Sequence, residues 1–350
     1  MHLYDKMVAN FSRSYIIAEL GSNHNGDMDI ARKLIDQAKQ AGCDCVKFQS
    51  WSKDTIFSKQ VYEQNHFLND DYRKRSDHTL ESIVDTFSIS ERELIEMRDY
   101  CKAIDIDFSS TPFSKREVDF LVNELAADFV KVASMDLNNY PFLNYIARKG
   151  KTVMLSTGLS TLDEIERAVS TVEATGNKRI VILHCVSIYP PDDAQVHLRN
   201  MDMLRENYPD YPVGFSDHTL GTLVPIAAIA RGAAVIEKHF TLDKNMFGWD
   251  HKVSATVDEM TVIVEAAKRL PVVMGDYRRR LSDADRNKIP AFRRSVVAAK
   301  PIASGHIITL DDLDCKRPGT GYPPDAMTVM VGRPAKRNIP YDKLLDQDDF

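Results

Sequence analysis

Short apolar segments alternate with amphipathic segments eight times between residues 15 and 276, and this alternation constrains the fold more than any other feature of the chain. Segments rich in β-branched and apolar residues predict strands, and apolar residues spaced three or four apart predict helices. Strands alternating with helices form parallel βα units, and eight such units in about 260 residues predict a (β/α)8 TIM barrel. The expected strands are residues 15–20, 45–49, 107–110, 129–133, 152–156, 179–186, 212–216 and 234–239. The clearest expected helices are residues 28–41, 91–104, 115–125 and 162–172.

Three regions depart from this repeating pattern. Residues 50–90 are rich in Asp, Lys, Tyr and Asn, which predicts an elaborated loop after the second strand. Residues 277–293 are polar and charged, and we expect a linker whose charges face solvent. Residues 294–350 are rich in turn residues, so we expect a small second domain after a barrel domain that spans residues 1–276.

The composition disfavours several kinds of partner. The chain has 45 basic and 51 acidic residues, a net charge of −6 and no long basic run, which disfavours nucleic acid and membrane surfaces. Its five cysteines include no Cys-x-x-Cys pair and predict no disulfide framework, so we expect a reducing cytoplasm. No segment has the pattern of a signal peptide, and the apolar run 223–230 is too short to cross a bilayer.

Polar and charged side chains gather where the expected strands end. In a TIM barrel the carboxyl ends of all strands meet at one face, and the chemistry takes place there. Each hydroxyl alone is more often a simple turn residue, but a lysine in an apolar strand needs a carboxylate or phosphate partner, because an unpaired buried ammonium is costly. Lysines, hydroxyls and backbone N–H groups at one barrel mouth suit an anion with phosphate and carboxylate groups. The side chains concerned are Glu19, Lys47, Gln49, Ser110, Thr111, Lys131, Ser134, Asp136, Ser156, Thr157, Ser187 and Tyr189.

Two histidines, His218 and His239, close the last two expected strands. Residues two apart on a strand share a face, so Ser216 faces the same side as His218, and Glu237 the same side as His239. Two imidazoles at neighbouring strand ends could share one divalent ion and leave positions for water and substrate. Two core histidines that only satisfy their hydrogen bonds are the alternative that the residues alone leave open.

Eight motifs, in this order along nearly the whole chain, resemble the sialic acid synthase family. They are AELGSNHNG at 18–26, VKFQ at 46–49, STPF at 110–113, VKVAS at 130–134, LSTG at 155–158, LHCVSIYP at 183–190, GFSDHT at 214–219 and EKHF at 237–240. The resemblance implies an enzyme that condenses phosphoenolpyruvate with an amino-sugar aldose, giving a nonulosonic acid and phosphate by C–O cleavage.

The resemblance also implies roles for single residues. His218 and His239 would hold a Mn²⁺ or Mg²⁺ ion that polarises the aldehyde oxygen of the open-chain sugar, and Glu19 would orient or deprotonate the attacking water. The residues implied around phosphoenolpyruvate are Lys47, Thr111, Lys131, Ser134, Ser156, Ser187 and Ser216. The residues implied around the sugar are Gln49, Asp136, Tyr189 and Asp250.

The last region, with KRPGTG at 316–321, resembles the antifreeze-like (SAF) domain that ends these synthases. The resemblance implies a homodimer in which the small domain of each chain covers the barrel mouth of the other, with Arg317 on the partner's sugar. A surface ion pair is the alternative for Arg317. The linker is long enough to reach either barrel, so the sequence leaves the choice open.

Two departures from the family pattern leave the sugar open. The sialic acid members have Ser-Gly-Glu where this chain has Ser134-Met-Asp136, and they have Asn at the position of Ser187. Because the acid is shortened and the amide becomes a hydroxyl, the aldose is either N-acetylmannosamine, its phosphate, or a 6-deoxy diacetamido sugar that leads to a legionaminic-type acid.

Three other functions are alternatives. A different phosphoenolpyruvate-condensing 3-deoxy-ulosonate synthase would need a second anion site for a sugar phosphate, and no spare pair of basic strand-end residues is present. A metal-dependent barrel hydrolase would place more metal ligands and a bridging carboxylate on the strand ends. A carbohydrate-binding protein without activity would leave the two lysines unexplained.

Overall fold

The computed structural model describes residues 1–65 and 78–350, and it divides into two compact units, Met1–Gly275 and Asp276–Phe350. The first unit confirms the predicted TIM barrel, because it contains eight parallel strands in one sheet. The strands are β3 (Tyr15–Gly21), β4 (Cys45–Ser50), β5 (Asp107–Pro112), β6 (Phe129–Val132), β7 (Thr152–Ser156), β8 (Ile180–Cys185), β9 (Val213–Asp217) and β10 (Val235–His239).

The sheet is almost closed. Its hydrogen-bonded order is β5-β4-β3-β10-β9-β8-β7-β6. The two end strands, β5 and β6, lie side by side, and the Ser109 hydroxyl of β5 donates to the Phe129 carbonyl of β6 at 3.2 Å. The carboxyl ends of all eight strands therefore point to the same face.

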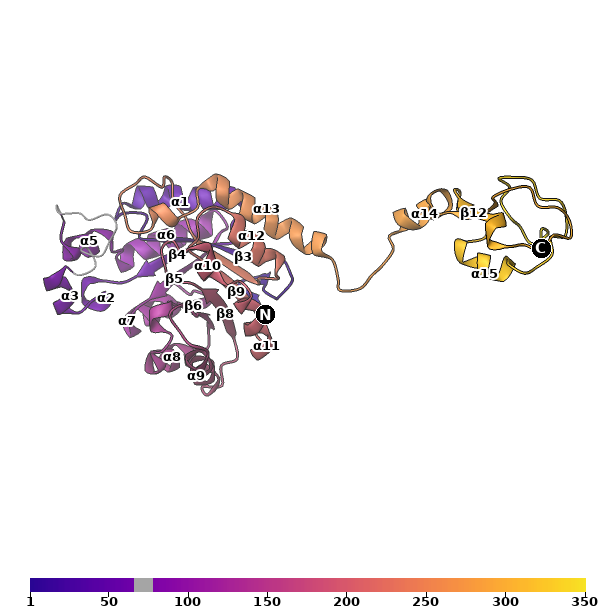
Figure 1. The fold of residues 1–350 in the computed structure, drawn as a ribbon. Helices are drawn as coiled ribbons and strands as arrows, with labels where there is room; N and C mark the ends of the chain where they lie inside the picture. Colours follow the sequence, from indigo (N-terminus) through magenta and orange to yellow (C-terminus); the bar gives the residue numbers. More distant parts are fainter. Residues whose placement is uncertain (66–77) are drawn as a thin grey trace. The chain divides into compact units, whose positions relative to one another are not determined.

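One long helix follows each strand, and Figure 1 shows these helices outside the strands. They are α1 (Met28–Ala41), α6 (Glu91–Ala103), α7 (Lys115–Asn123), α8 (Tyr140–Ala147), α9 (Leu162–Glu173), α11 (Asn200–Asn207), α12 (Leu223–Ala230) and α13 (Val257–Met274). The predicted start of α9 is confirmed, because Thr161 and Glu164 form a capping box. The main core lies between the strands and these helices.

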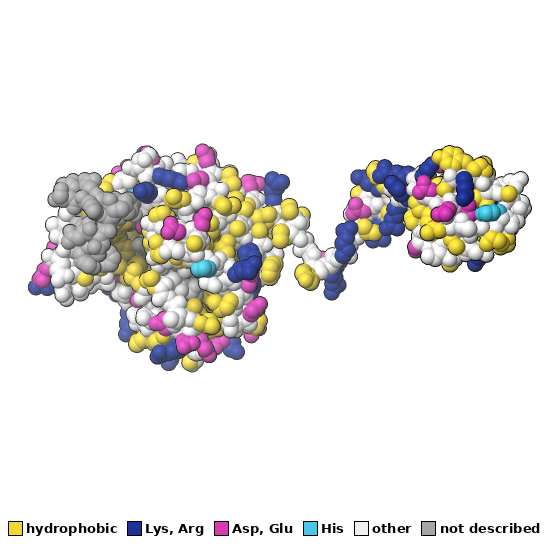
Figure 2. Space-filling model, viewed as in Figure 1, with side chains coloured by type: hydrophobic (Ala, Val, Ile, Leu, Met, Phe, Trp, Pro, Cys, Tyr) yellow, Lys and Arg dark blue, Asp and Glu magenta, His cyan; other side chains and the backbone are white. Residues whose placement is uncertain are grey.

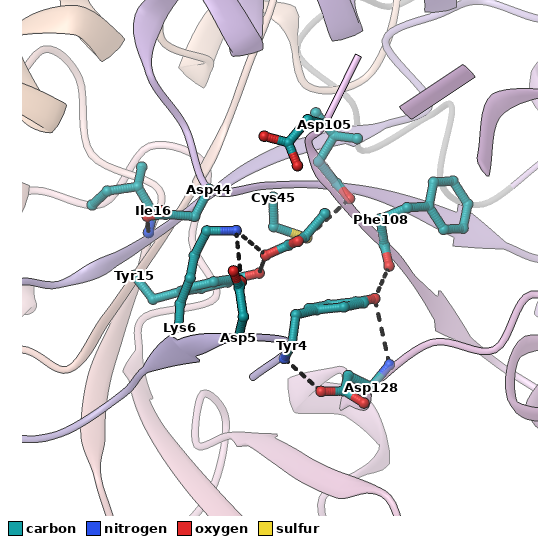
Figure 3. A network of polar contacts seen from close by, with 12 residues as sticks. Tyr4, Asp5, Lys6, Tyr15, Ile16, Asp44, Cys45, Asp105, Phe108 and Asp128 are labelled. Carbon is teal, nitrogen blue, oxygen red and sulfur yellow. Dashed lines mark hydrogen bonds and ion pairs between the residues drawn. The ribbon is translucent and has the colours of Figure 1, made fainter. Parts of the chain in front are cut away.

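A hairpin of β1 (His2–Leu3) and β2 (Lys6–Met7), which the sequence analysis did not predict, packs at the amino ends of the strands. Its Leu3 belongs to the same buried apolar core inside the barrel as Ile17 of β3. Figure 3 shows polar contacts of the hairpin, among them the Tyr4 hydroxyl, which donates to the Phe108 carbonyl. Lys6 also pairs with Asp107 at 2.7 Å. This end of the barrel is thus filled, and the functional cavity lies at the other end.

The second unit is small and has its own core. Strands β11 (Ser295–Ala298) and β12 (Leu313–Lys316) pair antiparallel, and short helical segments complete the unit. These are η3 (Leu310–Asp312), η4 (Pro324–Ala326) and α15 (Met327–Met330). The core around Val296, Ile302 and Leu345 is apolar, and the buried Asp349 pairs with Arg337 and Lys343.

The sequence analysis missed helices in two segments. The loop expected at 50–90 contains α2 (Lys53–Ile56), α3 (Lys59–Gln64) and α5 (Leu80–Phe87), while its residues 66–77 lie outside the described part of the chain. The stretch expected as a linker, residues 277–293, contains α14 (Asp283–Phe292), which begins with a capping box between Ser282 and Asp285. The Lys and Arg side chains of this stretch are exposed, and Figure 2 shows them in dark blue along it.

No helix in the described residues is long and apolar enough to span a lipid bilayer.

Candidate active site

The inner face of the barrel changes from apolar to charged toward the carboxyl ends of the strands. On β3, Tyr15 and Ile17 face the apolar inner core, and the next residue on the same face is Glu19. On β4, Cys45 belongs to the same core and is followed by Lys47. The two-residue period of a strand therefore places a charged layer directly above an apolar floor.

Above this floor lies a cavity of about 600 Å³, into which the strand ends and their loops converge. Thirteen of the fifteen predicted site residues line it. They are Glu19, Lys47, Gln49, Thr111, Lys131, Ser134, Ser156, Ser187, Tyr189, Ser216, His218, His239 and Asp250.

Two lysines and two glutamates form a buried cluster at the bottom of the cavity. Lys47 pairs with Glu19, donates to the Thr111 hydroxyl at 2.6 Å and lies 3.7 Å from Glu237. Lys131 lies 3.6 Å from the same Glu237. The prediction that each lysine needs an anionic partner is confirmed, and both partners are carboxylates of the protein.

The cluster shifts the pKa values of its members in opposite directions. Burial raises the pKa of Glu19 to about 7, with a further increase from Glu237, although Lys47 opposes both effects. Burial also disfavours the charged form of Glu237, but Lys131 and Lys47 outweigh it and lower the pKa of Glu237 to about 2. Glu237 is therefore ionised throughout the neutral range, whereas Glu19 exchanges its proton near neutrality.

Several hydroxyl groups surround the two lysines. The Ser216 hydroxyl donates to Glu237 at 2.9 Å, while the buried Ser156 hydroxyl has no hydrogen-bond partner in the described residues. The side-chain hydroxyls of Ser134 and Ser187 both lie close to Gly158. A Cβ atom on Gly158 would be 2.7 Å from the Ser134 oxygen and 2.2 Å from the Ser187 oxygen. These groups are donors that an anion between the lysines could use.

The two histidines lie beside this cluster with their ring centroids 5.4 Å apart. His218 Nδ1 lies 2.8 Å from the Val186 carbonyl and donates to it, which leaves Nε2 free to bind a metal ion. His239 Nδ1 is buried without a hydrogen-bond partner in the described part of the chain, and burial together with His218 lowers the pKa of His239 far below its usual value. Burial also disfavours the charged form of His218, but Cys185 and the Val186 carbonyl outweigh it and raise the pKa of His218. The His239 ring thus offers a neutral nitrogen, and His218 would do so after losing its proton on binding a divalent ion.

The described residues contain no group of three or more His, Cys, Asp or Glu side chains that could hold a metal. The two histidines would therefore leave the remaining positions of an ion to water and substrate, as in an open catalytic site.

Two predicted residues lie elsewhere. Asp136 is in η1 (Ser134–Asp136) and is not among the described residues that line the cavity; its carboxylate accepts a hydrogen bond from Asn139 at 3.2 Å. Arg317 belongs to the second unit, where its guanidinium lies 5.2 Å from the centre of the Phe292 ring.

The cavity also includes residues to which the sequence analysis gave no role. Glu237 shares a strand face with His239, and this spacing was the one signal that could have identified it. Cys185 lies at the end of β8, where burial favours its neutral thiol but His218 and Ser134 lower its pKa to about 7. The apolar wall comes mainly from loops, which have no periodicity that predicts them: Trp51, Ile56, Phe57, Phe113, Met135, Leu159 and Trp249.

Comparison with known proteins identifies the family. Residues 34–279 match the NeuB family, and residues 293–350 match the SAF domain. The chain belongs to the NeuB family. It is therefore an enzyme of the class that condenses phosphoenolpyruvate to make nonulosonic acids, and both the predicted family and the predicted SAF domain are confirmed.

Relatives in this family make different acids. The N,N'-diacetyllegionaminic acid synthase of Campylobacter jejuni is 38% identical over 339 residues, covering 95% of this chain and 99% of that protein. The pseudaminic acid synthase of the same species is 31% identical over 347 residues, covering 98% of this chain and 99% of that protein. The structure of a sialic acid synthetase from Leptospira borgpetersenii is similar with a TM-score of 0.73 and 28% identity, covering 83% of this chain and 94% of that one.

Proposed function

We propose that this NeuB-family enzyme condenses phosphoenolpyruvate with a 6-deoxy diacetamido hexose and releases phosphate and a legionaminic-type nonulosonic acid. The observation that carries the proposal is the cavity itself, which has a charged floor and an apolar outer wall. The higher identity to a legionaminic acid synthase than to the pseudaminic acid synthase supports the choice of product.

The floor suits phosphoenolpyruvate, which carries a phosphate and a carboxylate. Lys47 and Lys131 would stabilise these charges, and the hydroxyls of Ser134, Ser156 and Ser187 would donate to their oxygens. In the free protein Glu19 and Glu237 are the anionic partners of the two lysines. They outweigh burial and raise the pKa of Lys47, whereas burial outweighs Glu237 and lowers the pKa of Lys131. The substrate anion would take over this role in part.

Glu19 is suited to handle the proton of the attacking water. The methylene carbon of phosphoenolpyruvate bonds to the aldehyde carbon of the sugar, whose oxygen becomes a hydroxyl, and positive character develops at C2 of phosphoenolpyruvate. Water adds at C2 and gives a proton to Glu19, whose pKa of about 7 allows it to accept and later release a proton at neutral pH. The bond between C2 and the bridging oxygen then breaks while the new C2 hydroxyl gives its proton to the departing phosphate. The proton held by Glu19 passes to the oxygen of the former aldehyde, so the products are phosphate and the 2-keto acid.

The proposal includes a divalent ion, Mn²⁺ or Mg²⁺, at His218 and His239. Its support is the buried Nδ1 of His239, which has no hydrogen-bond partner in the described residues, and the orientation of the His218 ring by the Val186 carbonyl. When bound there, the ion would supply Lewis-acid polarisation of the sugar aldehyde.

The outer wall favours a sugar without a phosphate. Lys47 and Lys131 are the only Lys or Arg residues among the described residues that line the cavity, and both already belong to the floor. The side chains of Phe57, Met135 and Trp249 are apolar and suit the methyl group of a 6-deoxy sugar and the methyl groups of its acetamido substituents. Polar contacts to such a sugar would come from Gln49, Tyr189 and Asp250.

We further propose that the enzyme is a homodimer in which Arg317 of one chain acts at the sugar of the other. The family resemblance supports this arrangement, and so does the size of the second unit, since a small core gains stability from docking on a larger surface.

A panel of sugars tests the proposal. Phosphate release from phosphoenolpyruvate would be followed with Mn²⁺ or Mg²⁺ and with N-acetylmannosamine, its 6-phosphate, or 6-deoxy diacetamido hexoses. The highest kcat/KM is expected for the 6-deoxy diacetamido hexose that leads to legionaminic acid. A preference for either mannosamine compound would contradict the assignment of the sugar and leave the family chemistry intact.

A further inference from the structure

A loop of residues 241–254 follows β10 and carries Trp249 and Asp250 to the wall of the cavity. Its two ends are held together, because the Thr241 N–H donates to the Ala255 carbonyl at 3.0 Å and the Ala255 N–H donates to the His239 carbonyl at 2.7 Å. The base of this loop is thus fixed directly at His239, but its tip needs other contacts to keep Trp249 and Asp250 in place.

A second loop, residues 22–26 after β3, supplies these contacts through the buried Asn23 and the half-buried Asn25. The Asn23 amide donates to the Phe240 carbonyl and to the Ser254 hydroxyl, both at 2.9 Å. Farther along, the Asn25 amide donates to the Phe247 carbonyl at 2.7 Å. Two neighbouring asparagines of one loop therefore hold the base and the tip of the other loop.

His251 links the loop to itself and to Asn25. Its Nε2 lies 3.2 Å from Asn25 Oδ1, and its Nδ1 lies 2.7 Å from the Thr241 hydroxyl. Because an amide oxygen can only accept, Nε2 donates to Asn25 Oδ1. Nδ1 forms the second hydrogen bond with the Thr241 hydroxyl, whose oxygen also lies 3.0 Å from the Asp243 carbonyl. These hydrogen bonds connect Thr241, His251 and Asn25, and so join the loop of residues 241–254 to the loop after β3. They are shielded from water, because His251 is only 1% exposed.

The packing around this link is close. A Cβ atom on Gly248 would lie 2.4 Å from His251 Cδ2 and 3.0 Å from Asn25 Oδ1, so only glycine fits between them. The residue that follows Gly248 is Trp249. The centroid of its ring lies 6.0 Å from that of Trp51 and 5.9 Å from that of Phe87. Polar contacts on one side and aromatic contacts on the other thus determine the position of Trp249.

We propose that Asn25 and His251 are positioning residues for the sugar: they touch neither substrate, but they hold the loop of residues 241–254 so that Trp249 and Asp250 form the sugar side of the cavity. This inference rests on the proposed function in one respect, which is that the wall formed by Trp249 and Asp250 binds the aldose. The two lysines that would bind phosphoenolpyruvate, Lys47 and Lys131, lie on β4 and β6 and not on the strands that lead into the two loops.

The test uses two variants of the full chain and one control. His251→Phe keeps a ring of similar size but removes both hydrogen bonds, and Asn25→Ala removes the contacts from the other side. Asn177→Ala is the matched control, because the Asn177 amide also bridges backbone carbonyls, those of Ala147 and Lys151 at 3.0 Å and 2.9 Å, but far from the cavity. Far-UV circular dichroism shows whether each variant is folded.

Two readouts are measured on each variant. The first is KM for the aldose and for phosphoenolpyruvate in the phosphate-release assay. The second is acrylamide quenching of tryptophan fluorescence, which is independent of any sugar. The chain has 2 tryptophans, Trp51 and Trp249, and both line the cavity, so quenching reports directly on this loop and its neighbour.

Both variants are expected to raise the KM for the aldose about tenfold, the effect of losing one or two buried hydrogen bonds, while the KM for phosphoenolpyruvate changes less than about twofold. Quenching should rise in both variants and stay at the parent value in Asn177→Ala. Equal increases in both KM values, or an unchanged aldose KM, would overturn the positioning role. If the parent protein uses no sugar at all, the proposed function fails, and unchanged quenching in the two variants would then overturn the inference independently.

Discussion

Replacing Gly158 by alanine should disable the phosphoenolpyruvate site without unfolding the barrel. Gly158 does not have a positive φ, so its backbone accepts any residue, but its Cβ atom would lie 2.2 Å from the Ser187 oxygen and 2.7 Å from the Ser134 oxygen. Ordinary contact begins at 3.4 Å, so these hydroxyls would have to move by about 1.2 Å and about 0.7 Å. A misplacement of about 1 Å in a site of this kind costs about 100-fold in rate.

The assay is phosphate release as a function of phosphoenolpyruvate concentration, with thermal unfolding measured beside it. Gly158→Ala should lower kcat/KM for phosphoenolpyruvate about 100-fold, and the overpacking should cost about 1–3 kcal/mol of stability. The control is Gly150→Ala, where φ is +71° and no atom lies within 4 Å of the new Cβ, so about 1–2 kcal/mol is lost to backbone strain alone. A folded Gly158→Ala protein with kcat/KM within threefold of the parent would refute the roles given to Ser134 and Ser187.

Three further predictions concern protons, the ion and the second unit. Burial raises the pKa of Glu19 to about 7, so the ionised carboxylate is lost as the pH falls and kcat/KM should drop about tenfold per pH unit below 7. The variant Glu19→Gln should remove this pH dependence along with most of the activity. A chelator should abolish turnover and added Mn²⁺ or Mg²⁺ should restore it, whereas His218→Ala and His239→Ala should each stay inactive but folded; full activity in excess chelator would exclude the ion. Co-expressed Arg317→Ala and His218→Ala chains should recover part of the activity if Arg317 acts across a dimer, and a mixture as inactive as its components would show that each chain serves its own barrel.

The barrel could be predicted because the apolar patterns of its strands and its helices can each be recognised within a short stretch of sequence. Apolar runs such as Ile180–Cys185 and amphipathic runs such as Met28–Ala41 each identify their element without reference to the rest of the chain. The β1–β2 hairpin could not be predicted in this way, since each strand has two residues and its stability comes from distant partners such as Asp107 and Phe108.

The site residues that could be predicted are those at the expected strand ends and in the family motifs. Lys47 and Lys131 stand out because a charge in an apolar strand needs a partner, but that partner, Glu237, is 190 and 106 positions away and meets them only in the closed barrel. Trp249 and His251 lie in a loop whose conformation depends on side chains after β3, so no periodic pattern marks them. The departure from the family pattern at Asp136 was visible in the sequence, but the sequence did not show that Ser134 and Met135 line the cavity while Asp136 is not among the described lining residues.

The most direct test of the central claim is one reaction with phosphoenolpyruvate labelled with ¹⁸O at the bridging oxygen, a 6-deoxy diacetamido hexose and Mn²⁺ or Mg²⁺, analysed by mass spectrometry. The account predicts phosphate that contains the label and an unlabelled nonulosonic acid with the mass of the sugar plus pyruvate. Label that appears in pyruvate, or phosphate release without a new sugar acid, would contradict it.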